Sequence, residues 1–238
     1  MAERARSDYV EVGEAARLLG VSKRHVARLG ELGEIHYVGR GVVERASVNE
    51  YLSERKFSRE RAWSTETAWA AVALLSGLRA DWLGQTQLSR LRSRLRKMAL
   101  DSYGAHELIG RARERAEVRT YESYDFLVPS IKKHLIVVSR RKLDLAQTRR
   151  DELDGYIGVD AAEHLEKRYG LRRDSRGTLV LRVTTFDTDV IKRIATKGNG
   201  ALAALDTAAS QDARAHGVGS RALDSYLEEF ARGRHEVG

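Results

Sequence analysis

Four side chains that can bind an anion lie within six residues near the start of the sequence: Lys23, Arg24, His25 and Arg28. Lys and Arg donate hydrogen bonds to phosphate oxygens and to the N7 and O6 acceptors of guanine. Residues four apart share one side of a helix, so a helix over this segment would present Arg24 and Arg28 together. The chemistry that these residues offer is therefore recognition of a nucleic acid.

A helix-turn-helix would position these side chains. Residues 12–35 read VGEAARLLGVSKRHVARLGELGEI. This motif needs a small residue where its two helices touch, a glycine in the turn and an apolar residue that locks the second helix. Ala16, Gly20 and Val26 meet these three needs, because Gly20 can adopt the positive φ that ends the first helix. Ser22 is placed to cap the second helix. The alternative is an ordinary pair of helices with a solvated basic face.

The residues that follow favour a winged helix. Residues 35–38 alternate as a strand does, and Gly39-Arg40-Gly41 is a turn sequence. Residues 42–45, ending at Arg45, predict a second strand. Ser47 to Glu50 then have the spacing of a capping box that opens a further helix.

This segment resembles the excisionase-like, MerR-type winged helix-turn-helix domains from Tyr9 to about Lys56. The resemblance rests on the order V-x-E-A-A-x-L-L-G-V-S-x-x-x-V-x-R-L, then G-E-I, then a Gly-Arg-Gly wing and a serine-capped helix with Y-L. It implies a recognition helix and a basic wing tip that contact duplex DNA. The wing is short, with one basic residue at its tip. The predicted DNA-binding residues are Ser22, Lys23, Arg24, His25, Arg28, Arg40 and Arg45.

Composition narrows the class of protein. The chain has 238 residues, a formal net charge of +8, one proline and no cysteine, which excludes disulfides and thiolate metal sites. No apolar stretch is long enough to span a bilayer. The first eight residues carry charges of both signs and no apolar run, so we expect no secretory signal and a cytoplasmic location.

Three regions differ in pattern. We predict a winged helix-turn-helix domain over residues 1–56, a helical connector over 57–122 and an α+β domain over 123–238, so that the chain is mainly α with an α+β C-terminal half. In the last region, apolar runs at 135–139 and 178–183 predict strands. Asp160 and Glu163 have capping-box spacing before a helix that ends at Gly170. Residues 201–210 predict a helix, and Asp212 could cap a final one.

Residues 86–98, TQLSRLRSRLRKM, predict an amphipathic helix. Its apolar side consists of Leu88, Leu91, Leu95 and Met98. Arg90, Arg94 and Lys97 lie on another side and are candidates for contacts with phosphates or with an acidic partner. The other interpretation is a solvated basic face, which is the usual role of such a run.

A second resemblance covers the whole chain: a winged domain followed by such an α/β half looks like antitoxins of the AbiEi type, the regulators of type IV toxin–antitoxin operons. It rests on IVVS at 136–139, G-Y-I at 155–157, Y-G-L at 169–171, LVLRV at 179–183 and the tail A-L-D-x-A-x-S-x-D-A-R…G-x-x-x-L from Ala204 to Leu223. Arg140-Arg141-Lys142 depart from the small residues expected after the first run. The resemblance implies a regulator that represses its own operon and opposes a nucleotidyltransferase toxin. It assigns no residue to toxin binding.

We expect a binding protein rather than an enzyme. The strand at 178–183 carries only Arg182 among its charged groups, and neither Asp187 nor Asp189 has a lysine at the offset that a metal-dependent nuclease needs. The seven histidines do not have metal-ligand spacing. No catalytic residue, metal or cofactor is predicted. The two remaining functions are an autorepressing antitoxin and an excisionase-like architectural or recombination accessory protein. A homodimer is a further expectation, because a second copy doubles the DNA site.

Overall fold

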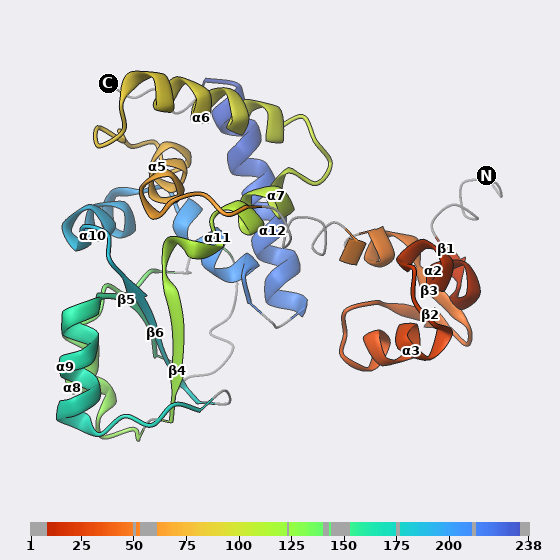
Figure 1. The fold of residues 1–238 in the computed structure, drawn as a ribbon, viewed down its shortest axis with the longest axis horizontal. Coiled ribbons are helices and arrows are strands. Elements are labelled where there is room, and N and C mark those ends of the chain that lie inside the picture. The colour runs from red at the N-terminus through yellow and green to blue at the C-terminus, as the bar shows by residue number, and fades with distance from the viewer. Residues whose placement is uncertain are drawn as a thin grey trace. The chain divides into compact units, whose positions relative to one another are not determined.

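The computed structural model divides the chain into two compact units, residues 1–61 (unit 1) and 62–238 (unit 2) (Figure 1). It describes residues 9–49, 51–52, 61–122, 124–139, 143, 153–174, 177–210 and 213–233. Both units combine helices with a three-stranded sheet, so the chain belongs to the α+β class.

Unit 1 is a small helical domain with an antiparallel sheet in the strand order β1-β3-β2. Its elements are β1 (Tyr9–Glu11), α2 (Val12–Leu19), α3 (Lys23–Glu31), β2 (Tyr37–Gly39) and β3 (Val42–Glu44), and residues 45–49 and 51–52 are helical. Its core consists of Val10, Ala15, Ala16, Leu19, Val26, Leu29, Ile35, Val43 and Val48.

The turn between α2 and α3 follows the local sequence as predicted. Gly20 ends α2 with φ of 66°, a conformation that costs glycine little. The Ser22 hydroxyl accepts a hydrogen bond from the backbone N–H of His25 and caps α3. The expected cap at Ser47 is wrong, because the helix already begins at residue 45. The buried Ser47 hydroxyl instead joins the carbonyl of Glu44 to the N–H of His36.

Unit 2 holds the remaining elements. They are α5 (Thr65–Leu75), α6 (Gln85–Met98), α7 (Gly104–Arg111), the 3-10 helix η1 (Arg113–Arg115), β4 (Glu117–Tyr121), α8 (Val128–Lys132), β5 (Leu153–Gly158), α9 (Val159–Tyr169), β6 (Leu179–Thr184), α10 (Thr188–Lys197), α11 (Ala201–Ala208) and α12 (Ala213–Ala231). In the sheet, β6 lies between β4, to which it is antiparallel, and β5, to which it is parallel.

The core of unit 2 joins segments from both ends of its sequence. Trp69 of α5, Leu95 of α6 and Leu227 of α12 belong to one buried cluster, and Figure 1 shows these helices grouped beyond one end of the sheet. A second cluster packs α8 and α9 against the strands and includes Leu165 of α9 and Leu181 of β6. The described residues 62–122 belong to the same compact unit as the C-terminal half, and the apolar sides of α5 and α6 are buried against α11 and α12.

Two expectations for the C-terminal half are corrected. Residues 135–139 form no regular strand, and Ile136 makes only an isolated bridge to Tyr156 of β5. The helix at 159–169 begins after Gly158, so Asp160 is inside its first turn and does not cap it. Gly170 ends this helix with φ of 60°, as predicted. Asp212 lies outside the described residues.

Among the described residues, no helix combines the length and the apolar character needed to cross a membrane.

Candidate nucleic-acid interface

Helix α3 separates an apolar side from a basic one. Val26 and Leu29 are buried in the core of unit 1. Lys23, Arg24 and Arg28 are exposed, and no ion pair within the described part of unit 1 neutralises them. Because packing fixes the apolar side, the basic side must face outward. The sequence predicted this division.

The N-terminal end of α3 adds to the attraction for anions. The first turn of a helix presents free backbone N–H groups and the positive end of the helix dipole. The Ser22 cap satisfies one of these groups, the N–H of His25. Lys23 and Arg24 occupy this turn and His25 is exposed beside them. A Cβ atom at Gly13 would lie 3.3 Å from Cε of Lys23, so the lysine stem extends along the first turn of α2. Basic side chains and the dipole thus act on the same region.

The hairpin of β2 and β3 carries the second group of predicted contacts. Arg40 is exposed in its turn, and Gly41 there has φ of 79°. The ring of Tyr37 packs on Gly30 of α3, where a Cβ atom would approach ring carbon Cε2 to 2.4 Å. The absence of a side chain at Gly30 therefore lets β2 pack closely against the C-terminal half of α3.

Arg45 differs from the other predicted DNA-binding residues. Its Nη2 lies 2.8 Å from Oε1 of Glu14, and the side chain is half-buried. The guanidinium thus joins the helix after β3 to α2. In this structure Arg45 stabilises unit 1 and is not presented to solvent as Arg24 and Arg28 are.

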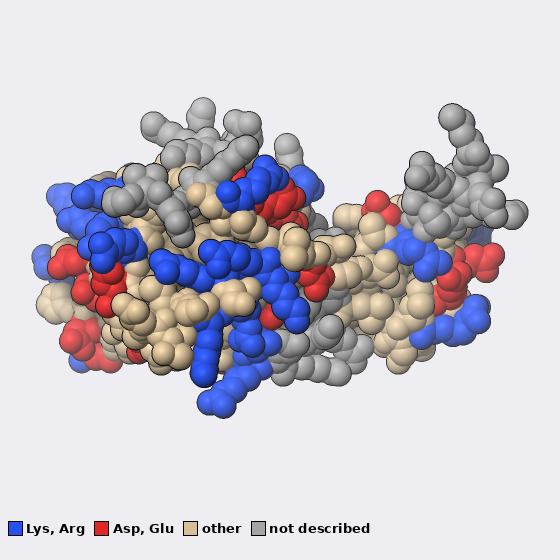
Figure 2. All heavy atoms as spheres, turned by 90° about the horizontal axis from the view of Figure 1, so that it is seen from above, with Lys and Arg blue, Asp and Glu red and all other residues tan. Residues whose placement is uncertain are grey.

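Helix α6 exposes a second basic surface, in unit 2. Leu91, Leu95 and Met98 are buried and Leu88 is partly buried, as the predicted amphipathic pattern requires. Arg90, Arg94 and Lys97 are exposed. Figure 2 shows Lys and Arg side chains in a band across the side of unit 2 on which α6 lies.

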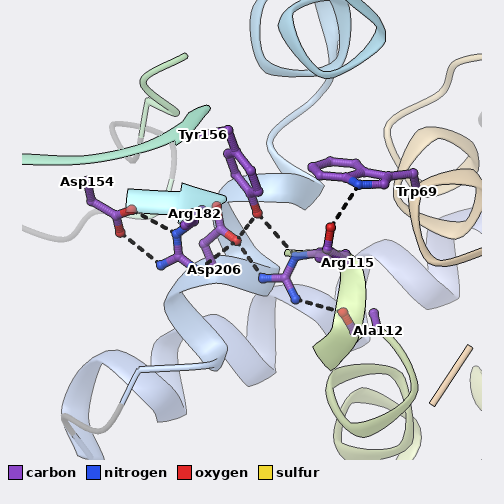
Figure 3. A network of polar contacts seen from close by, with 7 residues as sticks. All are labelled: Trp69, Ala112, Arg115, Asp154, Tyr156, Arg182 and Asp206. Carbon is purple, nitrogen blue, oxygen red and sulfur yellow. Dashed lines mark hydrogen bonds and ion pairs between the residues drawn. The ribbon is translucent and has the colours of Figure 1, made fainter. Parts of the chain in front are cut away.

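A buried polar network in unit 2 is the other place where chemistry-bearing groups meet (Figure 3). Asp206 of α11 accepts hydrogen bonds from Nη2 of Arg115 and from the hydroxyl of Tyr156, both at 2.6 Å. Arg182 of β6 lies 3.4 Å from the same carboxylate. Its guanidinium also donates two hydrogen bonds to Asp154 of β5, at 2.7 and 2.8 Å.

The charges in this network neutralise one another. Burial alone raises the pKa of the Asp206 carboxyl, but Arg182 and Arg115 with the hydrogen bonds from Tyr156 and Arg115 bring it below its ordinary value. Burial raises the pKa of the Tyr156 phenol, which stays protonated. The carbonyl of Arg115 accepts from Trp69 and Thr184. The network therefore joins η1, α5, α11 and the sheet. Its two carboxylates form ion pairs with the two arginines.

The sequence signal for this network is a charged residue inside each of two apolar runs. Asp206 interrupts the apolar run ALAALDTAA, and Arg182 interrupts LVLRV. A charge inside an apolar run predicts a buried partner of opposite sign. The spacing does not identify that partner, because Arg115 and Asp206 are 91 residues apart. Within the described residues, no group of three or more His, Asp or Glu side chains is arranged to hold a metal ion.

Comparison of the chain with protein-family models, with curated proteins and with solved structures finds no significant match.

Proposed function

We propose that the protein is a sequence-specific DNA-binding regulator and that unit 1 is a winged helix-turn-helix domain. The observation that carries this proposal is helix α3, whose apolar side is held by Val26 and Leu29 while Lys23, Arg24 and Arg28 stay exposed and unpaired within the described residues of unit 1. A second helix held in this way is the element that such domains insert into the major groove.

The remaining parts of unit 1 support the same proposal. The antiparallel hairpin of β2 and β3 is a short wing, and exposed Arg40 at its turn would contact a phosphate beside the groove. In this assignment, Ser22 caps the recognition helix and His25 adds a further donor. Arg45 supports the domain through Glu14.

The experiment is an anisotropy titration of the full chain with two labelled duplexes. One covers the region upstream of the protein's own gene, and the other has the same composition in scrambled order. We expect the wild type to prefer the upstream duplex by about 10³-fold or more at physiological salt. The triple variant K23Q/R24Q/R28Q should lose that preference.

The control variant is K132Q/K133Q/K167Q, which removes the same charge from exposed positions on or beside α8 and α9. It should keep the preference for the upstream duplex. If the wild type binds neither duplex at low salt, or if the α3 variant keeps the preference, the proposal is wrong. Equal binding of both duplexes by the wild type would instead favour the excisionase-like architectural role.

On the sequence resemblance alone, we propose further that the regulated operon is the protein's own and that the protein acts as an antitoxin. The test is growth of cells that express a neighbouring nucleotidyltransferase gene with or without this chain. Rescue of growth by the wild type supports the antitoxin role. Arrest in both cultures contradicts it and leaves DNA binding by unit 1 unaffected.

A further inference from the structure

The basic face of α6 is a strongly charged surface that the proposed recognition helix does not explain. We define this face as Arg90, Arg94 and Lys97, with Arg92 and Arg96 at its margins. The helix has five basic residues and no acidic one in 14 positions. Leu91, Leu95 and Met98 hold its other side in the core of unit 2, so packing fixes the direction of the charged side.

Several other arginines in unit 2 form ion pairs with carboxylates. Arg111 of α7 pairs with Glu107, and Arg232 after α12 pairs with Glu228, both across one helical turn. Within the described residues, no carboxylate pairs with Arg90, Arg94 or Lys97.

Repulsion between the cations of the basic face therefore lowers the stability of the free protein, and an anionic partner would remove this repulsion. Arg90 and Arg94 are four residues apart, as are Arg92 and Arg96, and like charges at this spacing repel each other on a helix. Arg96 partly offsets this repulsion, since its guanidinium lies 5.9 Å from the ring centre of Phe230.

The uncharged residues on this face indicate the kind of anion. Gln87, Ser89 and Ser93 are exposed on the same helix and can donate hydrogen bonds to phosphate oxygens. The helix contains no aromatic residue on which a base could stack. A rise of about 1.5 Å per residue spreads Arg90 to Lys97 over roughly 10 Å, a length that covers about three phosphates of one strand of duplex DNA.

We infer that the basic face of α6 binds the phosphate backbone of duplex DNA without reading its sequence. This inference rests on the proposed function and extends it, because it gives unit 2 a part in DNA binding. Base-specific contacts remain with α3, whereas α6 adds affinity that is the same for every sequence. Each phosphate that the face neutralises releases condensed counterions, so its contribution must depend on salt.

The experiment measures the salt dependence of binding by the full chain to the scrambled duplex, between about 50 and 200 mM salt. Each lost phosphate contact lowers the slope of log K against log salt by about 0.9. We expect R90Q/R94Q/K97Q to lower the slope by about 2 to 3. The control K132Q/K133Q/K167Q has the same change in charge at the end of unit 2 away from α6 in Figure 1, and should keep the slope.

A charge-preserving variant shows whether a change in slope comes from the lost charge or from a disturbed fold. R90K/R94K/K97R should keep the wild-type slope, and tryptophan emission should show that all variants unfold at the wild-type urea midpoint. A slope in R90Q/R94Q/K97Q equal to that of the control overturns the inference and leaves an acidic protein as the alternative partner of this face.

The two proposals fail in different ways. If the wild type prefers the upstream duplex but the α6 variant keeps its slope, only the inference on α6 is wrong. If the α6 variant loses slope while the wild type binds both duplexes equally, α6 binds DNA and the proposal of sequence-specific regulation is wrong.

Discussion

Replacement of Asp206 by asparagine tests whether the buried network holds unit 2 together. The side chain of Asp206 is 3% exposed and that of Arg115 is 5% exposed. Asparagine keeps the shape of the carboxylate but removes its charge, and its amide turns one acceptor into a donor. Within the described residues Asp206 is the carboxylate that pairs with Arg115, so Arg115 loses this ion pair, whereas Arg182 keeps its two hydrogen bonds to Asp154. The loss of stability should therefore come mainly from the buried charge of Arg115, which is left without its ion pair.

The size of the expected loss in unfolding free energy follows from the number of buried charges that Asp206→Asn leaves without a partner. Removing one partner of a buried ion pair costs about 3 to 5 kcal/mol. One of the two arginines keeps a bidentate carboxylate, and Arg115 keeps the carbonyl of Ala112 as an acceptor. We therefore expect Asp206→Asn to lower the free energy of unfolding of unit 2 by about 3 kcal/mol, at the lower end of that range.

Urea unfolding followed by tryptophan emission isolates this effect. All three tryptophans, Trp63, Trp69 and Trp82, belong to unit 2, so their emission reports that unit alone. The control is Glu228→Gln, which breaks the ion pair with Arg232 at 2.5 Å, where both side chains are 53% exposed. This change should cost less than about 1 kcal/mol. An Asp206→Asn variant as stable as the control would refute the reasoning that the network is an essential part of the core.

The same variant tests in which direction the contribution of Asp206 to stability changes with pH. The charges of Arg182 and Arg115 outweigh burial and hold the pKa of Asp206 in the folded protein below its ordinary value of 3.8. The carboxylate then contributes its full stability above that ordinary value and loses it as the pH falls through the lowered pKa. The difference in stability between wild type and Asp206→Asn should stay constant at higher pH and shrink in acid. A difference that grew in acid would contradict the assigned direction.

Two further substitutions test local features of the helices. Ser22→Ala removes the cap of α3 and should cost unit 1 about 1 kcal/mol, observed as roughly five-fold faster hydrogen exchange at the His25 amide; unchanged exchange would contradict the cap. Gly219→Ala should destabilise unit 2 by about 1 to 3 kcal/mol in urea, because its Cβ would lie 2.2 Å from the backbone nitrogen of Ala208. The matched change Gly217→Ala meets only the end of a side chain at 3.4 Å and should not destabilise the protein, so equal losses at both glycines would refute the packing argument.

The parts of the fold that the sequence predicted depend on neighbouring residues. Gly20 and Ser22 determine a helix end and a helix start through their own backbone and hydroxyl. Val26 and Leu29 repeat at helical spacing and face the core, which leaves the intervening cations exposed. The basic side of α3 could therefore be predicted from a short stretch of the chain.

Strand β5 shows why the C-terminal half was harder to predict. Its sequence LDGYIG contains Asp154 and Gly155, which are poor strand formers. Gly155 is required by packing, since a Cβ there would lie 2.9 Å from Cβ of Leu135. The run at 135–139 has the stronger strand pattern, yet it pairs with β5 only through an isolated bridge between Ile136 and Tyr156. Tertiary contacts decided which apolar run became the strand.

Ion pairs between distant residues limited the prediction of the site in the same way. Arg45 is a predicted DNA contact at the end of the second predicted wing strand, and in the structure Glu14, 31 residues earlier, accepts a hydrogen bond from it. The partner of a charged residue depends on the fold and cannot be found from spacing along the chain.

The net charge of +8 permits a polyanionic partner but does not say where that partner binds. Arg115 pairs with buried Asp206 and Arg182 with partly buried Asp154, so these two arginines add little to the electrostatic field outside the protein. Within the described residues, two groups of exposed cations without a carboxylate partner lie on α3 and on α6. Because α3 should decide which sequence is preferred and α6 should act equally on all sequences, the two triple variants ought to change different quantities in one titration. If both changed only the salt dependence, neither helix would read bases, and the protein would bind DNA by charge alone.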